Sequence, residues 1–229
     1  MRIENIVVGS SHLWHDVTKV GLHAIGEHLL ARGCRLEWFT IPLSLLHFLK
    51  PATARARIGH LRLALGRPPV EETETGRLVN RIPMTLIHPI RKGKLLSGHS
   101  VARSYLNWRL VRLPALAKRD GIHPVDMLLF DAGGIGVYYP FRDRARLTVY
   151  RINDFASEFP NQVRGQIESE REIIRQADIL LLAYRSMREE IIEMRGSDRG
   201  VHFLPNAVEI GLFSKPMAPP PEYATIPEP

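Results

Sequence analysis

The feature that most constrains the fold is a regular alternation of short apolar runs with segments of helical periodicity. Residues 3–11, IENIVVGSS, are a β-rich run that ends in small polar residues. Residues 16–33 then repeat apolar positions with a helical period and stop at a glycine, and residues 34–42, CRLEWFTIP, favour a second strand. This order predicts a βαβ unit, with parallel strands and a right-handed crossover.

The alternation continues along the chain. Further strands are predicted at 80–89, 124–134, 145–154, 178–185 and 200–208, and helices at 105–119 (bent or broken near Pro114), 165–177 and 186–195. Residues 44–79 are ambiguous and arginine-rich, and favour a helix followed by a loop. The fold class predicted from these patterns is α/β, a doubly wound, Rossmann-like, mostly parallel sheet with helices on both faces.

Composition limits the cellular compartments in which the protein is expected. Of its 229 residues 45% are hydrophobic, which is enough for a sizeable core, and Cys34 is the only cysteine, so no intrachain disulfide can form. No stretch approaches the ~18 apolar residues of a membrane span, and Glu4 and Asn5 interrupt any export signal. We therefore expect a cytoplasmic protein in a reducing compartment.

Positive charge is concentrated in one part of the chain. Residues 38–119 hold fifteen Lys and Arg against three acids, a net charge of +12, whereas the rest of the chain has a net charge of −5. Within that part, residues 91–119 contain eight basic residues and no acid. Such a surface attracts an anionic membrane, a nucleic acid or a phosphorylated substrate, or is a solvated face with no partner.

Ligands of open α/β sheets bind beyond the carboxyl ends of the strands, which selects the loops to inspect. The first, residues 9–16, brings His12, Trp14 and His15 together as candidate contacts for a sugar. It lacks the G-x-G-x-x-G dinucleotide fingerprint, which disfavours a nucleotide-dependent oxidoreductase. Asp16 is expected to cap the next helix, and a metal site of His12, His15 and Asp16 lacks further matching ligands, so we predict no metal.

Two further loops carry candidate chemistry. After the strand at 124–134, Gly133 and Gly134 favour either an anion-facing turn, which makes them candidate acceptor contacts, or a sharp turn under a helix. After the strand at 145–154, Asp154 ends a strand where a carboxylate can act as a general base, and Glu158 is a second candidate. The structural alternatives for Asp154 are a helix cap or an ion pair with Arg151.

The C-terminal part of the chain resembles the N-terminal half of GT-B glycosyltransferases. The likeness covers residues 168–213: a helix with acidic residues, Ala177-Asp178 opening a strand, Ser186 beginning a helix, and the segment PNAVE at 205–209 followed by Phe213. The first βαβ unit, with LARG at 30–33, is also similar, and the likeness is thin over 44–120. Ala207 departs from the family, in which many members have glycine.

The resemblance implies a division of the chain and a reaction. Residues 1–213 are expected to be the acceptor-binding domain, and residues 214–229, part of a proline-rich end, a linker towards a donor-binding domain that the sequence does not include. YRINDF at 150–155 is similar to a segment of membrane-associated bacterial glucuronosyltransferases of exopolysaccharide assembly, in which an Asp of the corresponding loop is the base. This implies that Asp154 is the base of an inverting transfer. We expect Glu158, further along the same loop, to contact the acceptor.

The resemblance also implies the partners. These are a nucleotide-sugar donor bound by the second domain, a lipid-linked saccharide acceptor and the anionic inner face of the membrane, with no cofactor and no nucleic acid. Residues expected to contact the membrane or the acceptor diphosphate are Arg103, Trp108, Arg109 and Arg112. The competing interpretation is a non-catalytic Rossmann-like module whose basic patch binds a membrane or a nucleic acid.

Overall fold

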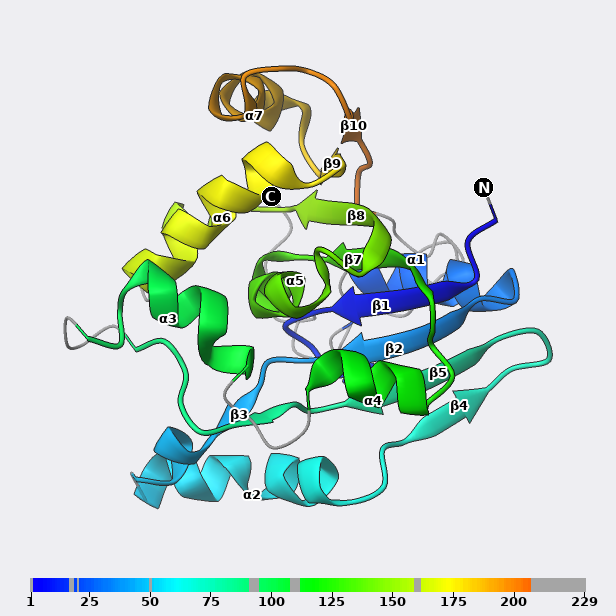
Figure 1. The fold of residues 1–229 in the computed structure, drawn as a ribbon, viewed down its shortest axis with the longest axis vertical. Helices are drawn as coiled ribbons and strands as arrows, with labels where there is room; N and C mark the ends of the chain where they lie inside the picture. Colours follow the sequence, from blue (N-terminus) through cyan, green and yellow to red (C-terminus); the bar gives the residue numbers. More distant parts are fainter. Residues whose placement is uncertain are drawn as a thin grey trace, which may run out of the picture.

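A computed structural model describes residues 2–16, 19, 21–49, 51–90, 95–107, 112–158 and 162–206, with the backbone alone for 51–57. Its centre is an eight-stranded sheet with the order β10-β9-β8-β7-β1-β2-β5-β4 (Figure 1). The strands are β1 (Asn5–Gly9), β2 (Arg35–Phe39), β4 (Val70–Glu72), β5 (Arg77–Arg81), β7 (Val125–Phe130), β8 (Ala145–Ile152), β9 (Ile179–Leu182) and β10 (Val201–Phe203). Neighbouring strands are parallel except β4, which runs antiparallel to β5 at one edge.

Helices cover both faces of the sheet. In Figure 1, α1 lies behind the sheet, and α3, α4, α5 and α6 lie in front of it. The helices are α1 (Gly21–Ala31), α2 (Pro51–Leu65), α3 (His99–Ser104), α4 (Leu113–Arg119), α5 (Ile135–Phe141), α6 (Arg164–Gln176) and α7 (Arg188–Arg195). Short 3₁₀ turns are η1 (Leu45–Phe48), η2 (Tyr105–Asn107), η3 (Ala132–Gly134), η4 (Ala156–Glu158) and η5 (Arg185–Met187). The predicted fold class is confirmed.

The central strands are buried on both faces, which is why they are nearly continuous apolar runs. Along β1, Ile6 and Val8 belong to the core layer under α1, and Val7 belongs to the layer under α3 to α6. All three side chains are fully buried. Since burying an aliphatic side chain of this size is worth about 1.5–3 kcal/mol, this alternation fixes the register of the first strand.

Some element boundaries differ from the prediction. The strand expected at 80–89 ends at Arg81, and a second, two-stranded sheet pairs β6 (Met84–Thr85) with β3 (Leu43–Ser44). Pro83 separates the two because it has no N–H to donate, and its carbonyl accepts a bond from Leu43 N. The break expected near Pro114 is present, since α4 begins at Leu113 and Pro114 lies in its first turn. In 44–79 the expected helix is present as α2, but the expected loop contains the hairpin of β4 and β5.

The strand order indicates where on the sheet a ligand is expected to bind. From β1 the chain builds outward through β2 and β5, then returns to the other side of β1 and continues through β7, β8, β9 and β10. The switch point therefore lies between β1 and β7, whose last residues, Gly9 and Phe130, are paired. In a doubly wound sheet ligands bind beyond the carboxyl ends of the strands at such a point. Within the described part of the chain, no helix combines the length and the apolar character needed to cross a bilayer.

Candidate functional site

A hollow of about 530 Å³ opens beyond the carboxyl ends of β1, β2, β7 and β8, at the switch point, and is called the crevice below. Most of its wall comes from the loops that follow these strands. It is lined by Ser11, His12, Ile41, Pro42, His47, His88, Pro89, Tyr105, Asp131, Ala132, Gly133, Asn153, Asp154, Gln162 and Gln166. Carboxylate, amide and imidazole groups on an otherwise apolar wall suit a polyhydroxylated ligand.

Asp154 lines the crevice and is exposed to solvent. Its neighbour Asn153 lines the crevice too, and the Asn153 Oδ1 atom is buried without a hydrogen-bond partner among the described residues. A buried acceptor without a partner is unfavourable unless a ligand or water donates to it. The pair therefore offers a reachable carboxylate beside an acceptor that a ligand hydroxyl can satisfy.

Two hydrogen bonds to Glu170 of α6 fix the loop that carries Asp154. Tyr150 Oη donates to Glu170 Oε1 at 2.5 Å, and Ala156 N donates to Glu170 Oε2 at 2.7 Å. Phe155 is buried in the core between these two contacts. Glu170 thus ties the end of β8 to the turn after Asp154, and holds the loop by contacts on both of its sides.

Asp154 does not form the ion pair with Arg151 that was considered for it. The guanidinium of Arg151 is buried, and Arg151 Nη2 donates to Asn206 Oδ1 at 2.7 Å, in the PN segment after β10. Among the described residues no ion pair joins Arg151 to Asp154. Glu158, the alternative base, is exposed on η4 and is not among the residues of the crevice wall.

Asp131 is a site residue that the sequence analysis missed. It follows β7, is only 6% exposed and lines the crevice with Asp154. Its Oδ1 accepts hydrogen bonds from Gly133 N at 2.9 Å and Gly134 N at 3.2 Å. Burial raises the pKa of Asp131 from 3.8 to about 6, although these hydrogen bonds and the nearby His12 and Arg151 lower it. The signal in the sequence was an aspartate two residues before a glycine pair, in Asp131-Ala132-Gly133-Gly134, which is a turn-capping pattern.

The raised pKa of Asp131 makes stability depend on pH. The folded protein holds this proton up to about pH 6, whereas the unfolded chain loses it near pH 3.8, so the free energy of unfolding falls as pH rises between these values. We expect Asp131→Asn to flatten the stability curve in that window, measured by urea denaturation at intervals of half a pH unit. An unchanged slope in the variant would contradict the assignment.

The turn at Gly133 and Gly134 packs against β1 and donates its N–H groups to Asp131, so it does not present them to a free anion. The N–H groups of Gly133 and Gly134, expected to face an acceptor, both donate to Asp131. A Cβ on Gly134 would lie 2.3 Å from the Gly9 carbonyl oxygen, and one on Gly133 would lie 2.4 Å from Ser11 Cβ. The turn is therefore held against the end of β1, and Gly133 alone of the two lines the crevice.

The three aromatic candidates of the first loop are split between two places. His12 lines the crevice, and its Nδ1 lies 3.6 Å from Asp16 Oδ2. Asp16 does not cap α1, which begins at Gly21, but accepts a bond from Leu13 N within its own turn. Trp14 and His15 line a separate hollow beside Glu71. The structure therefore does not bring Trp14 and His15 together with Asp154.

Trp14 is a core residue. It is 3% exposed, its ring lies 5.6 Å from that of His23 and 5.1 Å from that of Trp38, and its Nε1 donates to Glu71 Oε2 at 2.6 Å. We expect Trp14→Phe to lower the free energy of unfolding by about 2 kcal/mol, because a buried bond and part of a packed ring are lost. Urea denaturation measures this. Glu71→Gln, which keeps an acceptor oxygen, is the control and should change stability by less than about 0.5 kcal/mol.

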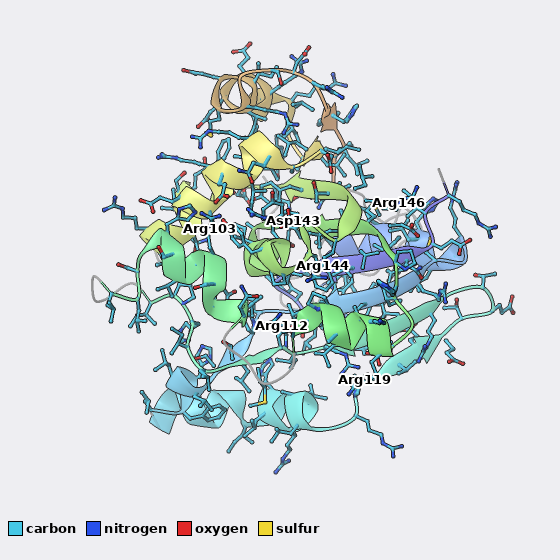
Figure 2. All side chains as sticks on the ribbon, in the orientation of Figure 1. Arg103, Arg112, Arg119, Asp143, Arg144 and Arg146 are labelled. Carbon is cyan, nitrogen blue, oxygen red and sulfur yellow. The ribbon has the colours of Figure 1, made fainter. Side chains whose placement is uncertain are left out.

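Of the predicted basic contacts, Arg103 and Arg112 lie on the face of the sheet that α3 to α6 cover. Figure 2 shows Arg103 on α3 and Arg112 and Arg119 at the two ends of α4, with Arg144 and Arg146 nearby on the same face. Arg103 Nη2 is 3.5 Å from Glu172 Oε1, and its guanidinium lies over the Tyr139 ring. Neither Arg103 nor Arg112 lines the crevice. The described residues do not include Trp108 and Arg109, residues 207–213 of the GT-B pattern, or residues 214–229, where a linker was expected.

In the part of the chain that the structure describes, no group of three or more His, Cys, Asp or Glu side chains is placed to hold a metal ion. No protein-family model matches the chain, and the search of the curated proteins gives no match. Among solved structures the chain is similar to a sucrose-phosphate synthase from Thermosynechococcus elongatus, at 15% identity and a TM-score of 0.49, over 91% of this chain and 92% of that one. The fold class itself rests on the strand order described above.

Proposed function

We propose that residues 1–213 are the acceptor-binding half of a glycosyltransferase that moves a sugar from a nucleotide-sugar donor to a saccharide acceptor. The observation that carries the proposal is the position of Asp154, an exposed carboxylate at the end of β8 that lines an open crevice at the switch point. The resemblance of residues 168–213 to the N-terminal half of GT-B glycosyltransferases supports the same reading. The donor is bound by a second domain, so this half alone does not turn over.

In the proposed reaction, the acceptor hydroxyl donates a hydrogen bond to the Asp154 carboxylate. As the hydroxyl oxygen attacks the anomeric carbon of the donor, its proton passes to Asp154 and the bond from that carbon to the nucleotide diphosphate breaks. A single displacement of this kind inverts the configuration of the sugar. Asn153 and His12 line the same wall and are placed to hold neighbouring hydroxyls.

Within this proposal the acceptor is lipid-linked and the setting is bacterial exopolysaccharide synthesis at the inner face of the cytoplasmic membrane. The support is the similarity of YRINDF at 150–155 to membrane-associated glucuronosyltransferases, which also favours a hexosyl or glucuronosyl donor. The net charge of +12 over 38–119 would favour an anionic leaflet by ~1 kcal/mol for each Lys or Arg near the surface.

The test is a transfer assay with the full-length protein. Labelled nucleotide sugars, UDP-glucuronate among them, are offered with lipid-diphosphate-linked saccharides, and the product is identified by mass and anomeric configuration. The proposal predicts transfer from at least one donor with inverted configuration. Absence of transfer from the whole panel, together with salt-sensitive binding to any DNA or RNA offered, would favour the nucleic-acid-binding module instead.

A further inference from the structure

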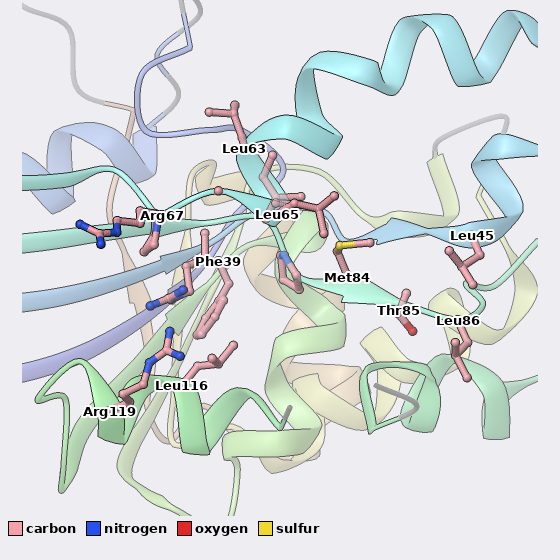
Figure 3. A pocket seen from close by; sticks show the side chains of 16 residues that line it. Phe39, Leu45, Leu63, Leu65, Arg67, Met84, Thr85, Leu86, Leu116 and Arg119 are labelled. Carbon is pink, nitrogen blue, oxygen red and sulfur yellow. The ribbon is translucent and has the colours of Figure 1, made fainter. Parts of the chain in front are cut away.

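A second hollow, of about 550 Å³, lies between the end of α2, β6 and α4 and does not share its lining with the crevice. Leucines and Met84 line it from η1, from the end of α2, from β6 and the residue after it, and from α4 (Figure 3). Leu65 is 69% exposed and Leu86 is 55% exposed, and Leu45 and Leu63 are exposed as well. Open leucine side chains around a hollow of this size indicate an apolar ligand.

Arginines stand at one end of this hollow. In Figure 3, Arg67 and Arg119 lie at the end opposite Leu45 and Leu86. The lining contains no carboxylate. Arg67 is exposed and forms no ion pair with a described residue, and Arg119, 64% exposed in its side chain, has its Nε 3.7 Å from Asp120 Oδ1. The third arginine of the lining, Arg81, is already bound by Glu37 and Asp120.

This arrangement fits a molecule with one apolar chain and an anionic head. The chain would run along Leu65 and Met84 towards Leu86, and the head would meet Arg67 and Arg119. The arginines are at the end away from Leu45 and Leu86, which stand two residues from His47 and His88 of the crevice wall. A lipid-linked acceptor with its sugar in the crevice would carry its diphosphate at that other end, so the ligand of this hollow is a different molecule.

The surroundings of the hollow point to a bilayer as the source. Among the described residues, eight of the twelve large hydrophobic side chains that are exposed lie between Ile41 and Leu86. The same part of the chain belongs to the stretch 38–119 with a net charge of +12. Exposed apolar side chains together with positive charge are the signature of a surface that lies in the headgroup region of an anionic membrane.

We propose that the hollow lined by Leu65, Met84 and Leu86 takes one acyl chain of an anionic membrane phospholipid, whose phosphate is held by Arg67 and Arg119. This binding site anchors the domain to the membrane at a place separate from the crevice. It requires neither donor nor acceptor, and it goes beyond the proposed function.

The site is tested first with a soluble probe. The chain is labelled with ¹³C at its methionine methyl groups and titrated with dodecyl phosphate, with dodecanol and with inorganic phosphate. Only the Met84 signal is expected to shift in a saturable way, with Met127 and Met187 in the cores as internal controls. Dodecyl phosphate should bind at least about tenfold more tightly than dodecanol, because the arginines hold its head, and inorganic phosphate should leave Met84 unmoved.

Matched variants locate the ligand. Leu65→Gln is expected to weaken dodecyl phosphate binding about tenfold, because it puts an amide where the chain packs, whereas Leu204→Gln changes an exposed leucine next to β10, at the opposite edge of the sheet, and should have no effect. Arg119→Gln should weaken the binding of dodecyl phosphate but should not change the binding of dodecanol. Its control is Arg188→Gln, which removes the same charge from a similarly loose ion pair, 3.8 Å from Asp198. All four positions are exposed, so thermal unfolding should be unchanged.

The source of the chain is tested by flotation with vesicles. Binding to vesicles of phosphatidylglycerol and phosphatidylcholine is expected to fall at least fivefold in Leu65→Gln and in Arg119→Gln, and to be unchanged in the two controls. No saturable shift of Met84 would overturn the site. If Leu65→Gln and Arg119→Gln lose dodecyl phosphate binding but still bind vesicles as the unmodified protein does, the bilayer is not the source of the acyl chain. Neither outcome depends on sugar transfer, so the site and the proposed function can fail separately.

Discussion

Asp154→Asn is expected to lower kcat for sugar transfer by about 10³-fold, because an amide cannot take the proton of the attacking hydroxyl. The KM for the acceptor should change by less than about threefold, since an amide oxygen still accepts the hydrogen bond from that hydroxyl. The measurement is the initial rate of the full-length protein with the donor and acceptor identified in the transfer assay.

Glu158→Gln is the matched control. Glu158 is also an exposed acid after β8, but it does not line the crevice, so its loss should change kcat by less than about twofold. A near-wild-type rate in Asp154→Asn together with a large loss in Glu158→Gln would transfer the role of base to Glu158. Near-wild-type rates in both variants would remove the base from this loop.

Gly134→Ala is expected to lower the free energy of unfolding by about 3 kcal/mol, the upper end of the usual cost of overpacking. The new Cβ would lie 2.3 Å from the Gly9 carbonyl oxygen, and this neighbour is backbone of a central strand that has no rotamer to change. The φ of Gly134 is −91°, outside the left-handed region that favours glycine, so the expected loss comes mainly from the steric contact. Urea denaturation at pH 7 measures it.

Gly59→Ala is the control for this substitution. Nothing lies within 4 Å of a Cβ at Gly59, which sits inside α2, so alanine should raise stability by up to about 1 kcal/mol through its helix propensity. Equal effects of the two substitutions would show that the contact between the glycine turn and β1 is not tight.

The sheet was predictable from the sequence because its central strands are buried on both faces. Runs such as VDMLLF of β7 are buried at every position and are apolar except for Asp126, so they lack the alternation of a half-exposed strand. The hairpin of β4 and β5 was not predictable, since β4 is a short edge strand of Val and Glu next to Pro68-Pro69. Its turn is closed by bonds between Thr73 and Gly76, which resemble those of many loops.

The site was predictable only in part, because side chains of one loop can face different places. His12 and Asp154 follow strands that end at the switch point, and the strand-end rule brought them into one crevice. Trp14 lies two residues from His12, yet its partner Glu71 is 57 residues away, and no local pattern predicts that bond. Asp131 was missed because its importance depends on burial, which a capping pattern does not reveal.

The most direct test of the central claim, that the crevice beyond β1, β7 and β8 holds the acceptor, is to map the bound acceptor by NMR. Backbone amide shifts of ¹⁵N-labelled residues 1–229 are followed while a water-soluble, short-chain diphosphate-linked saccharide is added. We expect the saturable shifts to be largest at residues 10–13, 131–134 and 152–156, and we expect Asp154→Asn to keep this pattern. Shifts confined to the hollow beside Trp14 and Glu71, or to α7 and β10, would contradict it.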